Sequence, residues 1–185
     1  MKNYSISQRI LLTVAAVLLS FSSTIAQQSD IALVTKNNST LPIYFPLDKN
    51  DFIRVSSRYG YRLHPILKKN KKHQGIDLVA AKGKPVFAAA SGTVEKADFV
   101  EGYGNRILLA HREDIKTLYG HLWIKMVTKG DTIQQGQIIG LVGDTGRVTG
   151  PHLHYEIWLK GKRVDPLMVW RSLIKKEDKE IAMNQ

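Results

Sequence analysis

Two histidines stand one residue apart in the stretch GPHLHYEIW, which runs from Gly150 to Trp158. The residues around and after them favour a β-strand, because Tyr, Ile and Trp are enriched in strands and Gly-Pro ends whatever precedes. In an extended chain, residues two apart point to the same side, about 6–7 Å from each other. His152 and His154 are therefore expected to share one face of a strand and Leu153 to occupy the other.

A second candidate group lies in HQGID, where His73 and Asp77 are four residues apart. A fully extended chain would separate them by about 13 Å, too far for one metal ion. We expect a bend at Gly75 to bring the two side chains together, since glycine permits conformations closed to other residues. Added to one histidine of the HLH pair, they make two imidazoles and one carboxylate. Three such ligands that leave a fourth position open for water are typical of a catalytic zinc site, whereas structural zinc sites are closed and usually contain Cys.

The other histidine of the pair, with His121 in YGHL, would then lie beside the metal without binding it. Such imidazoles can move protons or stabilise an oxyanion. For His111, which ends the run ILLAH, and His64, in YRLHP, ordinary exposed, turn or structural positions are the simpler interpretation. Tyr103 and Tyr155 are candidates either for lining a groove or for the core.

One further motif has a competing interpretation. GDTG, from Gly143 to Gly146, resembles the active-site triplet of aspartic peptidases. That chemistry would need a homodimer in which two Asp144 side chains share one proton. A glycine-rich turn capped by its Asp is the simpler explanation. The glycines also lack the Lys-Ser/Thr of a phosphate-binding loop, so nucleotide binding is not expected.

The first twenty-six residues have the layout of a secretory signal peptide. A basic lead, MKNYSISQR, precedes the apolar run ILLTVAAVLLSF and small residues up to a cleavage position after Ala26. The apolar run is shorter than the ~20 residues of a membrane-spanning helix. We therefore expect export to the periplasm or the extracellular envelope, with no stable membrane span after processing.

The composition indicates a basic globular protein without disulfides. A chain of 185 residues with 43% hydrophobic residues is long enough for one globular domain. Its formal net charge is +11, which would attract a polyanion, and for an exported protein we expect an envelope or wall polymer, not nucleic acid. The absence of Cys excludes disulfides and thiol catalysis.

The elements that would position these side chains are short β-like runs separated by glycine-rich turns. They are KPVFAAA, GTVEKADF, NRILLAH, IKTLYGHL, GQIIGLVG and HLHYEIWL. This spacing, with almost no helical period, predicts an antiparallel all-β domain. The basic stretch LKKNKKHQG, from Leu67 to Gly75, is interpreted as an exposed loop. Residues 27–50 are expected to form a lead-in segment against the domain. The C-terminal segment has apolar residues at helix-compatible spacing, Leu167, Val169, Trp170 and Leu173, before a charged tail.

The sequence resembles the lysostaphin/LytM-type zinc endopeptidases of bacterial cell walls. The resemblance covers nearly all of residues 52–166. It rests on SSRYGYRLHP, HQGIDLVAAKGKPVFAAASGTV, GYGNRILLAH, LYGHL, KGDTIQQGQIIGLVGDTGRVTGPHLHYEI and VDP, which follow one another in the order of that family.

The resemblance implies a single antiparallel β-sheet domain with an active-site groove and a short C-terminal helix or tail. Residues 1–26 would then be the signal peptide, 27–50 the lead-in, 51–168 the zinc metallopeptidase domain and 169–185 the tail. It implies that His73, Asp77 and His154 bind one Zn²⁺ and that His121 and His152 are the catalytic, non-ligand histidines. A monomer that acts on peptidoglycan is expected.

The implied reaction is hydrolysis of peptide cross-links, either glycyl-glycine or D-alanyl-diaminopimelate. A lone domain without a wall-binding module favours the second, by analogy. The alternatives are a zinc-bound but non-catalytic wall-binding or amidase-activator protein, and a biotinyl- or lipoyl-type carrier. The hairpin tips KGD and QQG lack the lysine that a carrier needs.

Overall fold

The structure of this protein is a computed structural model that describes residues 42–63, 69–112 and 114–172. The predicted signal peptide, the first part of the lead-in segment, His64 and most of the predicted tail lie outside the described residues. Among the residues that are described, none belong to a helix long and apolar enough to cross a membrane.

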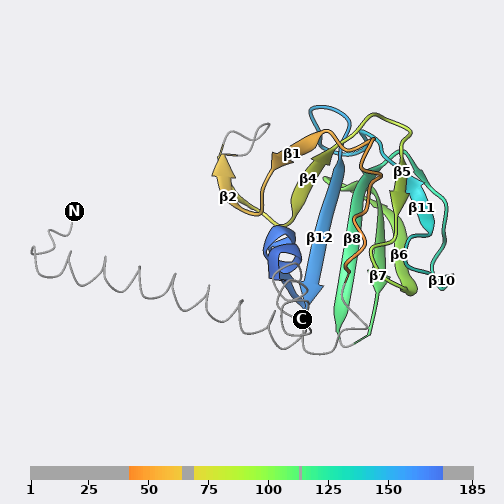
Figure 1. The fold of residues 1–185 in the computed structure, drawn as a ribbon. Helices are drawn as coiled ribbons and strands as arrows, with labels where there is room; N and C mark the ends of the chain where they lie inside the picture. The colour runs from red at the N-terminus through yellow and green to blue at the C-terminus, as the bar shows by residue number, and fades with distance from the viewer. Residues whose placement is uncertain (1–41, 64–68, 113, 173–185) are drawn as a thin grey trace, which may run out of the picture.

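The main element is an eight-stranded antiparallel sheet, in which β12 and β8 lie side by side near the centre (Figure 1). From one edge to the other, its strands are β1 (Arg54–Ser57), β4 (Ile76–Val79), β12 (Leu153–Leu159), β8 (Ile115–Leu122), β7 (Gly104–Ala110), β6 (Gly92–Val100) and β10 (Thr132–Ile133). The eighth strand, β13 (Lys162–Val164), pairs with the end of β12. The prediction of an antiparallel all-β domain is confirmed.

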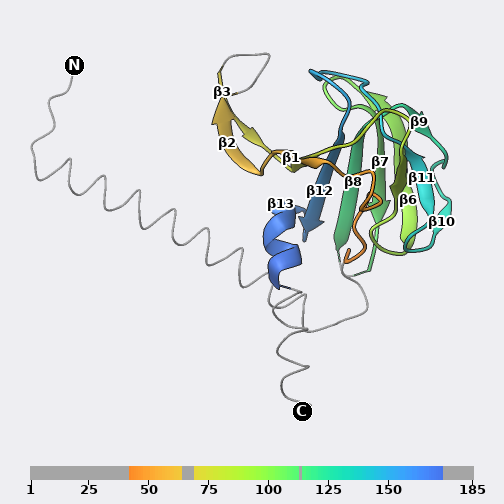
Figure 2. The same ribbon diagram turned by 45° about the horizontal axis from the view of Figure 1, so that its top comes forward.

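Two smaller sheets complete the fold. One consists of β5 (Pro85–Phe87), β11 (Ile138–Leu141) and β9 (Ile124–Lys125). The other is a hairpin of β2 (Gly60–Leu63) and β3 (Asn70–His73), which projects beside the edge of the large sheet (Figure 2). The interpretation of residues 67–75 as an exposed loop is therefore wrong for β3. The strand NKKH has no alternation of apolar and polar residues, and it is defined by its pairing with β2.

The hydrophobic core forms on one side of β12. Leu153, Tyr155 and Ile157 are fully buried there, in one cluster with Val86 of the small sheet and Ile107 of β7. The alternate residues His154 and Glu156 point to the opposite side of the strand. Strand alternation therefore separates the packing residues of β12 from its polar ones.

The chain ends that are described pack against this core. The helix at residues 166–172 begins after Asp165, whose Oδ1 accepts a hydrogen bond from the backbone N–H of Leu167 at 2.9 Å. Trp170 of the helix stacks on Tyr155, with 5.6 Å between ring centroids, so Tyr155 is a core residue. Phe45 of the lead-in segment contacts Trp170 as well, at 5.2 Å between centroids.

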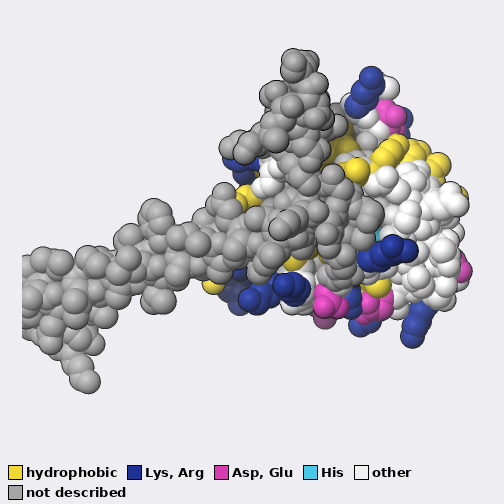
Figure 3. All heavy atoms as spheres, turned by 60° about the horizontal axis from the view of Figure 1, so that its bottom comes forward, with side chains coloured by type: hydrophobic (Ala, Val, Ile, Leu, Met, Phe, Trp, Pro, Cys, Tyr) yellow, Lys and Arg dark blue, Asp and Glu magenta, His cyan; other side chains and the backbone are white. Residues whose placement is uncertain are grey.

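Charged side chains are distributed over the surface. On the face shown in Figure 3, Lys and Arg lie interspersed with Asp and Glu. Among the described residues, Lys116 forms an ion pair with Glu95 and Arg106 with Asp98.

Candidate active site

Three neighbouring strands bring the candidate metal ligands together. His154 of β12 is the direct cross-strand partner of Asp77 of β4. His73 is the last residue of β3, and only Gln74 and Gly75 separate it from β4. Gly75 passes so close to β12 that a Cβ atom would collide with the carbonyl oxygen of Tyr155 and lie 2.9 Å from Cγ of Glu156. Close approach of the backbone is thus the reason that glycine is needed here, and its φ is not in the left-handed region.

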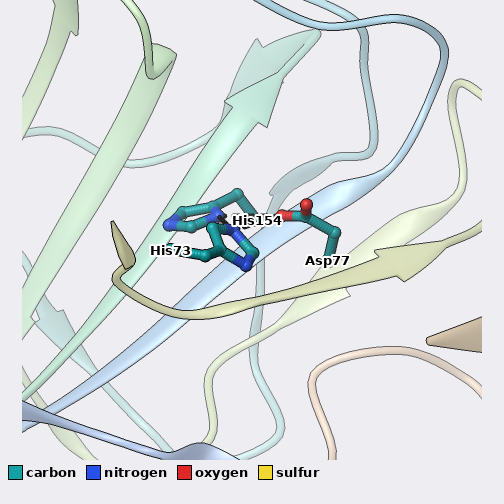
Figure 4. A group of neighbouring side chains, drawn as sticks. All are labelled: His73, Asp77 and His154. Carbon is teal, nitrogen blue, oxygen red and sulfur yellow. Dashed lines mark hydrogen bonds and ion pairs between the residues drawn. The ribbon is translucent and has the colours of Figure 1, made fainter. Parts of the chain in front are cut away.

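The side chains of His73, Asp77 and His154 converge on one point (Figure 4). Nε2 of His73 lies 3.1 Å from Nδ1 of His154 and 3.1 Å from Oδ1 of Asp77. The same Asp77 oxygen lies 2.9 Å from Nδ1 of His154. Two nitrogens and one oxygen therefore form a nearly equilateral triangle.

This triangle fits a tetrahedral metal ion. Bonds of about 2.0–2.1 Å to zinc place neighbouring ligand atoms roughly 3.3 Å apart in a tetrahedron. The three distances found here are a few tenths of an ångström shorter, and the donor set of two imidazoles and one carboxylate is one that zinc accepts. The residues present therefore fit a zinc ion with one or more positions open to solvent.

The outer nitrogens of both imidazoles are held by acceptors, which fixes their orientation. Nδ1 of His73 lies 2.9 Å from the backbone oxygen of Arg58. Since a carbonyl can only accept, Nδ1 carries the hydrogen and Nε2 presents its lone pair to the site. For His154 the arrangement is reversed, because Nε2 faces the carboxylate of Glu156 at 3.0 Å and leaves Nδ1 facing Asp77.

Glu156 was not identified from the sequence, although it continues the alternation of His152 and His154 along the strand. It is fully buried, and both of its oxygens are saturated with donors. Oε1 accepts from Tyr103 Oη at 2.7 Å and from His154, and Oε2 accepts from Trp158 Nε1 at 2.6 Å and Arg163 Nε at 2.9 Å. Burial alone would raise the pKa of Glu156, but the hydrogen bonds and the positive charges of His154 and Arg163 lower it to about 2.

The electrostatics of the group favour a cation at its centre. Burial acts to raise the pKa of Asp77, but the two imidazoles beside its carboxylate, His154 first and then His73, hold it well below its usual value. Burial acts to lower the pKa of His154, yet hydrogen bonds to Asp77 and Glu156 outweigh it and raise the pKa to about 9. Two carboxylates on either side of one imidazole thus attract a positive charge, which a metal ion would supply.

The two remaining candidate histidines lie beside this group. The ring centroid of His121 is 4.7 Å from that of His152 and 5.7 Å from that of His154. Nδ1 of His121 lies 2.9 Å from the backbone oxygen of Thr145, and Nδ1 of His152 lies 2.8 Å from that of Gly150. Both therefore donate from Nδ1, so that Nε2 is the nitrogen with the lone pair in the neutral form of each ring, and for His152 this atom is 3.6 Å from Oδ1 of Asp77.

His121 has two further properties of an active-site residue. Burial, followed by the charges of His154 and His152, lowers its pKa to about 3, so that the ring is neutral at physiological pH. Its φ is 62°, in the left-handed region that non-glycine residues seldom adopt. Such backbone strain clusters at functional sites.

All five side chains line one open pocket of about 610 Å³. Its walls come from β1, the β2–β3 hairpin, the turn between β6 and β7 and the loop before β12. The lining side chains include Arg62, Lys71, Lys72, Gln74, Glu101, Tyr103, Arg147 and Arg163. Tyr103 is thus a groove residue as well as a partner of Glu156.

The other candidates lie elsewhere. Asp144 forms an exposed ion pair with Lys82 at 2.8 Å and does not belong to the metal group. His111 is half-buried rather than exposed, and its ring nitrogens lie 2.8 Å from the backbone oxygen of Ser91 and 2.8 Å from Oγ1 of Thr117. The ring fits there because Gly92 has no side chain, since a Cβ would lie 2.7 Å from Nδ1 of His111.

Comparisons with known proteins match this chain to peptidases. The family model described as Peptidase family M23 matches residues 71–166. Peptidoglycan DD-endopeptidase ShyC of Vibrio cholerae is 45% identical over 120 residues, which cover 64% of this chain and 28% of ShyC. The chain therefore spans less than a third of the length of that relative.

Solved structures agree with the sequence matches. A zinc-containing peptidase from Vibrio cholerae superposes with a TM-score of 0.61 and 35% identity, covering 65% of this chain and 37% of that one. The catalytic domain of the antimicrobial peptidase lysostaphin from Staphylococcus simulans gives a TM-score of 0.58 and 32% identity, covering 66% of this chain and 93% of that one.

Proposed function

The chain belongs to peptidase family M23, and from this premise we propose that it is a zinc-dependent endopeptidase that hydrolyses peptide cross-links of bacterial peptidoglycan. The resemblance to lysostaphin/LytM-type peptidases is thereby confirmed. The observation that carries the proposal is the triangle of His73 Nε2, Asp77 Oδ1 and His154 Nδ1, open to a pocket that two further histidines line.

In the proposed site, His73, Asp77 and His154 hold the zinc ion, one per chain. When bound, zinc supplies Lewis-acid activation of a water molecule and of the substrate carbonyl. His152 or His121 accepts the proton of the attacking water at its unprotonated Nε2. The Nδ1–H groups remain anchored to the carbonyls of Gly150 and Thr145, so that neither ring has to reorient as it gains the proton.

The same two histidines serve the later stages. A ring that has gained a proton carries an Nε2–H, which donates a hydrogen bond to the oxyanion of the tetrahedral intermediate. That proton is then transferred to the leaving amine, which restores the neutral imidazole. Glu156 and the carbonyl of Arg58 keep the two ligand imidazoles in their orientation throughout.

We propose that the bond is the D-alanyl-diaminopimelate cross-link. ShyC is a relative named as a peptidoglycan DD-endopeptidase, which supports this choice over the glycyl-glycine bridge. Export to the periplasm or envelope follows from the signal-peptide pattern of residues 1–26, with a mature N-terminus at Gln27. A monomer is proposed because one chain supplies the complete set of site residues.

Digestion of purified sacculi of both cross-link types tests the proposal. We expect soluble muropeptides whose masses correspond to cleavage of the diaminopimelate cross-link, loss of activity on chelation and recovery on addition of zinc. A protein that binds zinc and sacculi but releases no product would instead be the non-catalytic wall-binding or activator protein. Activity that survives chelation but yields to an aspartic-peptidase inhibitor would transfer the chemistry to Asp144.

A further inference from the structure

The β2–β3 hairpin places two positive charges directly opposite each other. Arg62 of β2 and Lys71 of β3 are cross-strand partners, and both line the pocket that contains His73 and Asp77. Like charges directly opposite in an antiparallel pair are destabilising. A pair of this kind at the mouth of a site is useful when an anion binds between the two side chains.

Arg62 has unused hydrogen-bonding capacity. Its Nη2 lies 3.5 Å from Oδ2 of Asp77, at the limit of a hydrogen bond. Its Nε is buried and has no hydrogen-bond partner among the residues that the structure describes. The planar guanidinium has five N–H donors in a geometry that matches a carboxylate, so Arg62 can bind one from the pocket.

The other cations of the pocket are engaged. Arg147 pairs with Glu101 at 2.8 Å, and Arg163 donates to Glu156 at 2.9 Å. Lys72 lies over the ring of Tyr59, 4.9 Å from its centroid. Asp77 and Glu101 are the acidic residues that line the pocket in the described part of the chain. Among the described residues no acidic side chain pairs with Lys71, and the one that pairs with Arg62, Asp77 at 3.5 Å, also belongs to the metal group, so both cations can still bind an anion.

We propose that Arg62 and Lys71 form a subsite for a carboxylate of the substrate, adjacent to the scissile bond on the side of the β2–β3 hairpin. This inference rests on the proposed function and names the chemical class that the site selects. In a D-alanyl-diaminopimelate cross-link, the carbon next to the scissile nitrogen bears a free carboxylate. In a glycyl-glycine bridge the same position has none.

The distances fit this assignment. A carboxylate carbon on the carbon next to an amide nitrogen lies roughly 2.5 Å from that nitrogen. Arg62 lies one hydrogen-bond length from Asp77, which is itself part of the proposed metal group. A peptide bond positioned at that group thus places the carboxylate within reach of Arg62, and Lys71 adds a second charge from the opposite strand.

A pair of synthetic cross-linked peptides that differ only at this position tests the subsite. One has the free carboxylate and the other a carboxamide. We expect the zinc-loaded protein to favour the carboxylate in kcat/KM by roughly ten- to hundredfold, the range for hydrogen bonds to a charged group. In Arg62→Gln and Lys71→Met this preference falls, and in the double variant it approaches one.

Lys129→Met is the matched control, because it removes one positive charge from an exposed turn residue outside the pocket. It should keep the preference of the wild-type protein. A second readout avoids catalysis: calorimetric binding of the amino-side product, with and without its free carboxylate, to the metal-free protein. Arg62→Gln should lose the preference for the carboxylate form there as well.

The rival explanation is that Arg62 only supports Asp77. In that case Arg62→Gln loses zinc while the ratio between the two substrates stays unchanged, which would overturn the subsite, as would equal cleavage of both substrates by the wild-type protein. Failure to cleave either substrate would overturn the proposed function instead. Calorimetry with the product pair would then decide the subsite alone.

Discussion

Replacing Glu156 by Gln should weaken zinc binding without touching a ligand. The carboxylate of Glu156 accepts four hydrogen bonds, two at each oxygen, and one of them comes from Nε2 of His154. An amide has one acceptor oxygen, and its NH₂ group would face two donors in either orientation. In one orientation the NH₂ group would face Nε2 of His154, which would lose its acceptor. In the other it would face Trp158 and Arg163, which would disturb the packing that holds Nδ1 of His154 toward Asp77.

The magnitude follows from burial and charge. Removing the negative charge from the buried carboxylate leaves Arg163 without its ionic partner, and because the Arg163 side chain is 32% exposed and water can solvate it, the loss is about 1.5–3 kcal/mol of folding free energy, as for a hydrogen bond to a charged group. Loss of an acceptor behind a metal-bound histidine typically weakens metal affinity 10–100-fold. The two effects are separable, because the first acts on the metal-free fold and the second on the metal.

Trp158→Phe provides the matched control. It deletes the donor at Oε2, 2.6 Å away, and leaves Oε1 facing His154. It should destabilise the metal-free protein by about 1.5–3 kcal/mol, as for one hydrogen bond to a charged group, with zinc affinity within a few-fold of wild type. The assays are competition of zinc with a chelator of known affinity and urea unfolding of the metal-free proteins.

The outcome that refutes this reasoning is specific. If Glu156→Gln binds zinc as tightly as the wild-type protein, Glu156 does not orient His154. If Trp158→Phe loses as much affinity as Glu156→Gln, the effect is a general consequence of a weakened fold.

The remaining predictions concern the elements around the site. Burial lowers the pKa of His111 below its usual 6.5, so the contribution of this residue to stability is complete above that pH and decreases as the pH falls below it. The unfolding free energy of the wild-type protein, measured relative to His111→Gln, should therefore drop by at most about 1.4 kcal/mol per pH unit in that range. A difference that does not depend on pH would contradict this. Gly75→Ala should cost about 1–3 kcal/mol in thermal unfolding, because its Cβ meets the backbone of β12, whereas Gly150→Ala, with nothing within 4 Å of the added atom, should be neutral. Equal melting temperatures for the two alanine variants would refute the packing argument. His121→Gly should be more stable than His121→Ala by about 1–2 kcal/mol, since only glycine adopts a φ of 62° without strain; the opposite order would show that the left-handed backbone is not retained.

The longer strands could be predicted from the sequence because each has its own signal. The runs at β6, β7, β8 and β12 combine β-branched or aromatic residues with glycine-rich turns, and the structure has strands at all four. Two short strands, β5 and β11, also lie in predicted runs, but others could not be predicted in this way. β3 has the sequence NKKH and β13 the sequence KRV, and each exists because a partner strand pairs with it. Pairing of this kind is set by the whole fold and leaves no local pattern.

The residue types of the candidate site could be predicted from the sequence, but the groups that orient these side chains could not. The spacing of His73, Asp77 and the HLH pair predicted two imidazoles and one carboxylate, but which histidine of the pair binds the metal was implied only by the resemblance to the lysostaphin/LytM-type peptidases. The acceptors that orient them are mostly backbone carbonyls, those of Arg58, Thr145 and Gly150, and backbone groups have no signature in a sequence. Glu156 is the exception, because it shares a strand face with both histidines and could have been singled out by alternation.

The central claim is that, within HLH, His154 binds the metal and His152 takes part in the reaction. Metal content and turnover measured on the same variants test it most directly. We expect one zinc per chain in the wild-type protein and in His152→Ala, and none in His154→Ala at the same free zinc concentration, because only two ligands remain there. Both variants should lose cleavage of the cross-linked peptide, His152→Ala by roughly 10²–10⁴-fold, the contribution of a general base. A His152→Ala protein that contains no zinc, or one that cleaves at the wild-type rate, would contradict the account.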